Sequence, residues 1–341
     1  MDFVTLLAKE FNLKPQQVQA VIELLDAGNT IPFIARYRKE MTGSLDDQVL
    51  RELAERLEYL RNLQKRREEI EKTLSDQGVL TEELQAQLMK AQTLAELEDL
   101  YRPFRPKRRT RATIAKERGL EPLALWLSLQ LPKGDPLTEA AKFVDPEKEV
   151  PDAESALAGA RDIIAEQISD DAALRKELRS LLLREGVIET KAAKEEDSVY
   201  SMYYDYREAV PRMAAHRVLA VNRGEREEYL KVSLLAPEEK AQTLVKNDFV
   251  RPGSRASEQV ALACKDAWER LLFPSLEREI RNTLTDRANV QAIKVFSQNL
   301  HQLLMQPPIK GKVTLGVDPG FRTGCKLAVI DENGKVLDTG V

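Results

Sequence analysis

The apolar positions of the first three hundred residues follow a helical period. Periodicity predicts helices over about 2–10 and 15–26, and Gly28-Asn29 is a stop signal for the second. Ser44 with Asp47 resembles a capping box and predicts the start of a long helix that Gly78 ends. Its leucines recur at 3-4-3 spacing and form a stripe typical of a helical hairpin or a coiled-coil seam: Leu50, Leu53, Leu57 and Leu60, extended by Ile70 and Leu74.

Further helices follow, together with one short strand. Thr81 is expected to begin a helix, and Thr93 with Glu96 to cap another that runs to Tyr101. Periodicity predicts helices over 152–168 and 170–185, the latter ending at Gly186. Residues 228–234 alternate between apolar and polar, which predicts a small β element near 228–235 after a turn at Arg223-Gly224.

The last part of the chain changes from helical to β character. One helix face, running from Val260 to Leu272, is expected to end at Pro274. The next helix ends at Pro307-Pro308 and places ten apolar residues on one side: Leu276, Ile280, Leu284, Ala288, Ala292, Val295, Phe296, Leu300, Leu303 and Leu304. We therefore predict a mainly α protein with three domains: a helical domain over 1–200, a helical region with the β element and the long helix over 201–310, and the start of an α/β domain over 311–341.

Composition excludes several function classes. The 52 Lys and Arg against 56 Asp and Glu give a net charge of −4, so any nucleic-acid contact must come from a local patch. Cys264 and Cys325 are far apart, and His216 and His301 stand alone, which argues against a disulfide framework, a zinc ribbon and an H-E-x-x-H helix. No stretch approaches the roughly 20 apolar residues of a membrane span. We expect a cytoplasmic protein without cofactor or metal and without a membrane partner.

The segment from Tyr101 to Leu120 is strongly basic. Only Glu117 opposes eight cations, which gives a local charge of +7: Arg102, Arg105, Lys107, Arg108, Arg109, Arg111, Lys116 and Arg118. Pro103 and Pro106 keep its first part out of a helix interior, and Tyr101 and Phe104 interleave with the charges. Guanidinium groups bind phosphate oxygens in a bidentate manner. Arg102, Arg105, Lys107, Arg108, Arg109 and Arg111 are the candidate nucleic-acid-binding residues; the alternative is a run that is solvated or paired with neighbouring acids.

Two other clusters are weaker candidates. Tyr200, Tyr203, Tyr204 and Tyr206 could stack on bases, but tyrosines at this spacing more often pack between elements. His216 with Glu225 could form an acid-base pair. Nothing nearby supplies a nucleophile or orients the histidine, so a helix that ends at Gly224 with a satisfied histidine is the preferred interpretation.

Near the C-terminus, an apolar β-run from Val313 ends in Asp318-Pro319-Gly320, and a glycine-bearing turn with Thr323-Gly324 leads into a second run. This pattern holds a carboxylate at a strand end beside a loop that could cradle a phosphate. The candidate residues for such a phosphate or metal site are Asp318, Gly320, Thr323 and Gly324. Two-metal catalysis needs several carboxylates. Asp331 and Asp338 are poor second ligands, because Asp331-Glu332-Asn333-Gly334 looks like a hairpin turn. We expect no catalysis by this chain.

Several blocks of the sequence resemble the bacterial Tex family of transcription accessory proteins. Residues 31–43 are similar to the N-terminal signature of the family, and Glu98-Asp99-Leu100-Tyr101 followed by residues 107–112 and 119–124 resembles a second block. His216-Arg217 with Arg223-Gly224-Glu225, and residues 271–275, resemble a third and a fourth. The Asp318-Pro319-Gly320 turn is similar to the start of the YqgF-type, RNase H-like domain.

The resemblance implies a non-catalytic scaffold with helix-turn-helix elements that binds RNA or DNA without regard to sequence, in or beside transcription. Family members continue into the rest of the YqgF-like domain, a helix-hairpin-helix region and an OB-fold RNA-binding module, so we expect a fragment or a truncated form. RNA polymerase or other transcription machinery is a further expected partner. The alternatives are a metal-dependent nuclease of the RNase H-like class built around Asp318, and a protein-interaction scaffold that uses the helices at 45–77 and 275–306.

Overall fold

The computed structural model describes residues 2–106, 109–194, 196–307, 310–320 and 324–341. The chain forms two compact units. Unit 1 comprises Met1–Glu189, Arg207–Pro211 and Ser233–Arg281, and unit 2 comprises Thr190–Tyr206, Arg212–Val232 and Asn282–Val341. The described residues are mainly helical, with two small three-stranded sheets, which confirms the predicted fold class. Among them, no helix is both long and apolar enough to span a membrane.

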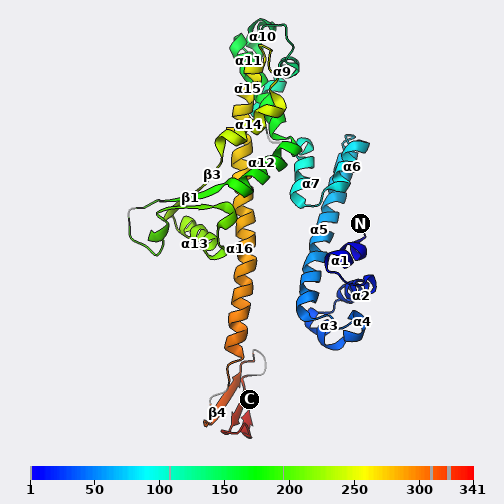
Figure 1. The fold of residues 1–341 in the computed structure, drawn as a ribbon, viewed down its shortest axis with the longest axis vertical. Coiled ribbons are helices and arrows are strands. Elements are labelled where there is room, and N and C mark those ends of the chain that lie inside the picture. Colours follow the sequence, from blue (N-terminus) through cyan, green and yellow to red (C-terminus); the bar gives the residue numbers. More distant parts are fainter. Residues whose placement is uncertain (1, 107–108, 195, 308–309, 321–323) are drawn as a thin grey trace. The chain divides into compact units, whose positions relative to one another are not determined.

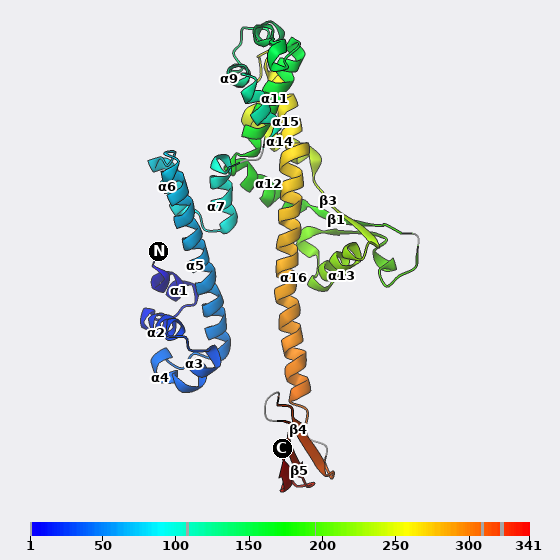
Figure 2. The ribbon, with the colours of Figure 1, turned by 180° about the vertical axis from the view of Figure 1, so that it is seen from behind.

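The N-terminal part of unit 1 is a group of short helices packed along one long helix (Figures 1 and 2). Its elements are α1 (Phe3–Glu10), α2 (Pro15–Asp26), α3 (Ile31–Tyr37), α4 (Lys39–Thr42) and α5 (Asp47–Asp76). The predicted leucine stripe of α5 is buried. Leu50, Leu53, Leu57 and Leu60 pack against α1–α3, and Ile70 and Leu74 belong to a second cluster with α6 (Glu82–Lys90) and α7 (Leu94–Tyr101). The stripe therefore builds the core of this part of unit 1.

The start of α5 differs from the prediction. Asp46 is the N-cap, and its carboxylate accepts a hydrogen bond from the Val49 backbone N–H at 2.9 Å. Ser44 instead has a φ of +61° and ends the preceding turn. Asp46 satisfies an amide of the first turn as effectively as serine does, so the capping-box prediction was displaced by two residues.

The Thr42-Gly43 pair of the N-terminal signature has a structural reason. Gly43 has a φ of +66°, and a Cβ there would lie 2.4 Å from Gln17 Nε2. That Gln17 amide donates to the Thr42 carbonyl at 3.0 Å. The positive φ favours glycine, and a side chain there would displace the Gln17 amide, so glycine suits the left-handed corner at which α2 is hydrogen-bonded to the end of α4.

The middle of unit 1 is an assembly of short helices around α11. Its elements are α6 (Glu82–Lys90), α7 (Leu94–Tyr101), α8 (Arg111–Glu117), α9 (Glu121–Leu129), α10 (Pro136–Ala140), α11 (Ala153–Ser169) and α12 (Ala172–Glu185), with short 3-10 turns between them. Thr81 and Thr93 cap α6 and α7, and Gly186 ends α12, as predicted. Helix α11 contacts α8, α9, α10 and α15 (Ser257–Asp266), and its buried residues recur from Ala156 to Ser169.

The first sheet has the order β2-β1-β3, from β1 (Val187–Ala192), β2 (Asp205–Ala209) and β3 (Leu230–Leu235). Only β3 was predicted, because β1 and β2 carry charged residues at positions where an alternating pattern would show apolar ones. Helix α13 (Ala215–Arg226) continues through Gly224, where a turn was expected. Gly224 is buried, and a Cβ there would lie 2.7 Å from Leu230 Cδ1, so this glycine permits close packing instead of ending the helix.

Pro274 does not end a helix. After α14 (Glu238–Phe249), the helix α15 (Ser257–Asp266) passes through a π-helical segment at Ala267–Leu272 directly into α16 (Phe273–Leu304). The Phe273 N–H donates to the Trp268 carbonyl, five residues earlier. A proline lacks an N–H, and its ring meets the carbonyl four residues before it. The wider π turn accommodates Pro274, so the helical path continues and the predicted break was wrong.

The ten apolar residues of α16 do not form one buried stripe. Leu276, Ile280, Leu284 and Ala288 are buried, but Val295, Phe296, Leu300, Leu303 and Leu304 are exposed. At about 100° per residue, Leu276 to Ala288 lie roughly opposite the arc that runs through Ile293, Phe296 and Leu300. The apolar face therefore changes sides near Ala288, which corrects the prediction of a single face.

The second sheet, in unit 2, is an antiparallel meander of order β4-β5-β6, from β4 (Thr314–Asp318), β5 (Lys326–Ile330) and β6 (Val336–Gly340). The change from helix to strand between Leu304 and Thr314 confirms the predicted change of character. The Asp331 carboxylate accepts from the backbone N–H groups of Asn333 at 2.9 Å and Lys335 at 2.8 Å, and Gly334 has a φ of +84°. This is the predicted hairpin turn.

Candidate nucleic-acid interface

The basic segment runs from the end of α7 to the end of α8 in unit 1. After Tyr101, a 3-10 turn at Arg102–Phe104 leads to Thr110, the N-cap of α8, whose hydroxyl accepts from the Thr113 N–H at 3.1 Å. The start of the segment, which contains the two prolines, is not α-helical, as predicted. Ala112 and Ala115 anchor α8 in the core, so its charged residues lie towards solvent.

Four of the described cations of this segment form ion pairs with acids. Arg102 Nε lies 3.2 Å from Asp170 Oδ1, and Arg109 Nη2 lies 3.0 Å from Glu117 Oε2. Lys116 and Arg118 pair with Glu121 and Glu149. The alternative of internal pairing therefore applies to part of the segment.

Arg102 and Arg118 are the least exposed of these four cations, and burial affects the pKa of Arg102. Burial lowers the pKa of its guanidinium, the positive charge of Arg175 lowers it further, and Asp170 opposes both effects. Its side chain retains about a third of its exposure and is held by Asp170. Its geometry is suited to fixing the 3-10 turn against the α11–α12 junction.

Arg105 and Arg111 are exposed, and neither forms an ion pair with an acid of the described ranges. Lys107 and Arg108 lie outside the described residues. Arg109 is 71 % exposed despite its contact with Glu117, and such surface pairs are weak and exchange easily. Arg105, Arg109 and Arg111 are thus the described cations of the segment whose guanidinium groups are accessible to a phosphate.

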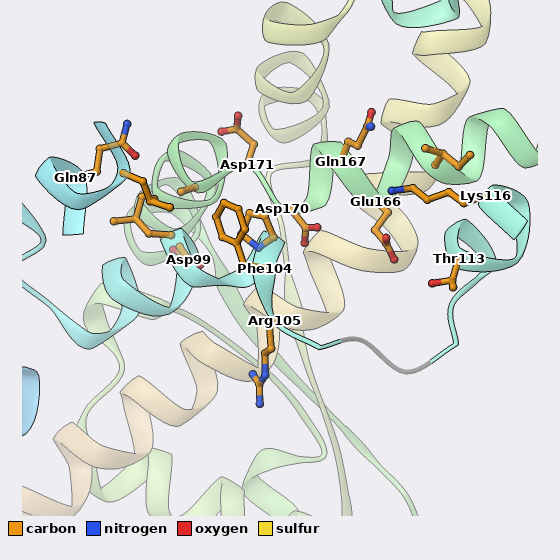
Figure 3. A pocket seen from close by; sticks show the side chains of 15 residues that line it. Gln87, Asp99, Phe104, Arg105, Thr113, Lys116, Glu166, Gln167, Asp170 and Asp171 are labelled. Atoms are coloured by element: carbon orange, nitrogen blue, oxygen red, sulfur yellow. The ribbon is translucent and has the colours of Figure 1, made fainter. Parts of the chain in front are cut away.

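A cavity of about 730 Å³ opens beside this segment, entirely within unit 1. Its lining comes from α6, α7, the 3-10 turn, α8, α11 and the start of α12. Figure 3 shows Phe104 and Asp170 close together, Gln87 and Asp99 on one side, and Thr113, Lys116, Glu166 and Gln167 on the other. The Arg105 side chain extends away from the Phe104 ring. The cavity therefore combines an aromatic ring, amides and carboxylates beside exposed arginines.

Asp99 connects the cavity to a buried ion network. Asp99 Oδ1 accepts from Arg175 Nε at 2.7 Å, and its other oxygen accepts from Arg179. Arg179 also contacts Glu279 of α16. The Asp99 and Arg175 side chains are 7 % and 3 % exposed, and Arg175 Nη1 has no hydrogen-bond partner among the described residues. The network fixes α7 and α12 to the start of α16.

The Asp318 turn lies in the second sheet, and its strand is exposed along its length. Asp318 is the last residue of β4 and is the register partner of Lys326. Gly324 has a φ of +83°, Gly320 is exposed, and Thr323 lies outside the described residues. No group of three His, Cys, Asp or Glu side chains with a geometry suited to a metal occurs in the part of the chain that the structure describes.

The tyrosine cluster packs within unit 2. Tyr200 and Tyr203 are buried with Val221 and Leu230, and Tyr204 and Tyr206 pack against them. The Tyr200 hydroxyl donates to Glu227 at 2.8 Å. His216 is exposed in the first turn of α13, and that helix runs past Gly224 to Arg226, where the preferred interpretation had it end. The structure therefore confirms that the four tyrosines pack between elements, which was their preferred interpretation.

Sequence reasoning singled out Phe104 but missed most of the cavity lining. Gln87, Gln167, Asp170 and Asp171 come from segments far from the basic stretch. Their only local signal is the Asp171 N-cap, which accepts from the Leu174 N–H at 2.8 Å. A helix cap predicts a helix start, and it says nothing about which distant segment the helix start meets.

Three models of known protein families match the chain in succession. The Tex-like protein N-terminal domain matches residues 1–75, the Tex central region-like model matches residues 131–296, and the Tex protein YqgF-like domain matches residues 312–341. Together they extend from the N-terminal helices to the second sheet, in the order that the sequence blocks predicted.

Curated relatives match nearly the whole chain. It is 46 % identical to the uncharacterized protein YdcI of Bacillus subtilis over 98 % of the chain and 47 % of that protein. It is 43 % identical to the transcriptional accessory protein Tex of Neisseria gonorrhoeae over 99 % of the chain and 46 % of that protein. A human S1 RNA-binding domain-containing protein is 30 % identical over the whole chain and 36 % of its own length.

The chain thus spans about half the length of the bacterial relatives it matches. The identity extends across both units and across the segment between residues 75 and 131 that the family models leave out. The chain therefore belongs to the Tex family, with its N-terminal and central regions and the first strands of its YqgF-like domain.

Proposed function

We propose that this chain is a non-catalytic, nucleic-acid-binding scaffold of a cytoplasmic transcription accessory protein. The observation that carries the proposal is the accessibility of Arg105, Arg109 and Arg111 on one short segment of a chain with a net charge of −4. Neutralising phosphates with such side chains releases counterions and favours binding without regard to sequence. The names of a Tex relative and an S1 RNA-binding relative support a role beside RNA and transcription.

The test is the affinity of the chain for single-stranded RNA and for duplex DNA at low salt, measured by fluorescence anisotropy. The variant replaces Arg105, Arg109 and Arg111 with alanine. The control replaces Arg51, Arg184 and Arg255, which are exposed arginines of unit 1 away from the segment, and changes the net charge equally. We expect the variant alone to lose most of the binding. Equal binding by variant and control would contradict the proposed interface.

The absence of catalysis is part of this proposal. Asp318 lies opposite Lys326 in the register of the sheet, an arrangement suited to a cross-strand charge pair. We expect no Mg²⁺- or Mn²⁺-dependent cleavage of RNA or DNA by a full-length family member with this sequence. Metal-dependent cleavage that Asp318→Ala abolishes would establish the nuclease alternative.

The exposed apolar face of α16 favours a second candidate function, a scaffold for protein partners of transcription. Val290, Ile293, Phe296, Leu303 and Leu304 are each more than 60 % exposed. Contiguous exposed apolar surface of this kind is typical of interaction sites. Purified RNA polymerase should bind the chain at moderate salt without nucleic acid, and Phe296→Ser with Leu303→Ser should abolish that binding if this function applies.

A further inference from the structure

We propose that the cavity beside Phe104 takes a single unpaired base of the bound nucleic acid, which extends the proposed function from phosphate contact to base contact. The cavity, about 730 Å³, falls within the range of roughly 300–1,000 Å³ typical of small-molecule sites. A base in it would belong to the same strand whose phosphates meet the exposed arginines. The inference rests on the proposed function.

The lining offers the contacts that a base requires. Phe104 is half-buried against the core cluster of α5–α7, so its ring is fixed while part of it faces the cavity. An aromatic face stacks on any base. The side chains of Gln87 and Gln167 are exposed at the cavity, and an amide both donates and accepts hydrogen bonds. This combination suits a flat, polar, uncharged ring.

The charges of the lining keep a phosphate outside. Four carboxylates line the cavity, from Asp99, Glu166, Asp170 and Asp171, against the cations Arg105 and Lys116. Arg102 pairs with Asp170, and Arg175 and Arg179 pair with Asp99, which offsets part of this negative charge. Among the described lining residues the carboxylates still outnumber the cations, so the interior presents hydrogen-bond acceptors to a ligand. A phosphate would be repelled from it and would remain near Arg105, which extends away from the ring.

The same acceptors set a base preference. A carboxylate oxygen accepts more than one hydrogen bond, and carboxylates accept from the exocyclic amino group of cytosine. Uracil has carbonyl oxygens where cytosine and adenine carry amino groups, and these would face the carboxylates unfavourably. We therefore expect cytosine- and adenine-containing strands to bind more tightly than uridine strands.

The experiment compares three single strands of equal length: oligocytidine RNA, oligouridine RNA and a strand whose sugars carry no bases. Anisotropy gives the affinity of each for the wild-type chain, for Phe104→Leu and for Gln167→Ala. Leucine keeps the apolar packing of Phe104 and removes its ring. Tyr37→Leu, at an exposed aromatic residue of α3 in the same unit, is the matched control. Thermal melting confirms that each variant is folded.

We expect the wild-type chain to bind oligocytidine about tenfold more tightly than the abasic strand, the scale of one base stacked on an aromatic side chain. Phe104→Leu should remove most of this difference in affinity and leave the binding of the abasic strand unchanged. Gln167→Ala changes an exposed residue and should also reduce the difference, which provides a test even if Phe104→Leu fails to fold. Equal affinity for oligocytidine and the abasic strand would contradict the base pocket but would not affect the proposed phosphate interface.

Two other outcomes separate this inference from the proposed function. If no strand binds the chain at low salt, both the proposed function and the base pocket fall. If an arginine-rich peptide binds and Phe104→Leu weakens it while strand binding stays unchanged, the cavity belongs to a protein partner and the base pocket is wrong.

Discussion

Two sets of arginines in unit 1 have opposite surroundings. Arg175 and Arg179 are enclosed with Asp99 and Glu279, whereas Arg105 and Arg111 are exposed on a segment of eight cations. The composition of the chain does not distinguish them. Burial distinguishes the two sets, because an enclosed guanidinium requires a fixed partner, whereas an exposed guanidinium is available to a ligand. The comparison teaches that local charge in the sequence identifies a binding segment only after the paired cations have been subtracted.

The largest expected effect comes from breaking the enclosed set. Asp99→Asn keeps the shape of the side chain but leaves Glu279 to face both Arg175 and Arg179, so one enclosed positive charge loses its compensation. We expect a loss of about 3–5 kcal/mol in the free energy of unfolding, the cost of an uncompensated buried charge. Urea unfolding measures it. Asp47→Asn, which removes an exposed partner of Arg51, should change stability by at most about 1 kcal/mol. Similar losses in both variants would contradict the distinction.

A further enclosed arginine extends the comparison to α5. Arg67 is 1 % exposed, and it donates from Nε to the Leu88 carbonyl and from Nη2 to the Ala91 carbonyl, each at 2.9 Å. Arg67→Met leaves both carbonyls at the end of α6 unpaired. We expect a loss of about 2–4 kcal/mol, measured by urea unfolding. A change below about 0.5 kcal/mol would show that these carbonyls find other partners.

Arg102 lies between the two sets, and it sharpens the comparison. It belongs to the predicted phosphate-binding group, but Asp170 holds it and burial lowers its pKa. We expect Arg102→Ala to lower stability by about 1–2 kcal/mol and to weaken RNA binding less than Arg105→Ala does. Melting temperature and anisotropy, measured on both variants, decide the assignment. A larger loss of RNA binding for Arg102→Ala than for Arg105→Ala would show that Arg102 belongs to the phosphate-binding interface.

The smallest stability effect is expected at Arg109. Its ion pair with Glu117 is exposed on both sides, and such pairs contribute about 0–1 kcal/mol. Arg109→Ala should leave the unfolding midpoint in urea nearly unchanged. Glu117→Gln, which frees the guanidinium, should tighten RNA binding if Arg109 contacts phosphate. Weaker RNA binding by Glu117→Gln would argue that the pair itself positions the segment.

The helical architecture was predictable, but the cavity and some interruptions were not. The α5 stripe and the caps at Thr81 and Thr93 depend on local spacing, which sequence displays directly. The helix end predicted at Pro274 was wrong because a π turn accommodates the proline, and whether a π turn forms depends on the surrounding packing. The cavity depends on contacts between residues such as Arg102 and Asp170, 68 positions apart, and no local pattern records such a contact.

The most direct test of the account is the salt dependence of RNA affinity. Each phosphate contact to a single strand contributes about −0.7 to the slope of log affinity against log salt. Replacing Arg105 and Arg111 together with alanine should therefore make the slope shallower by about 1.4, with no change in melting temperature. An unchanged slope in a folded double variant would contradict the claim that the exposed arginines bind phosphate.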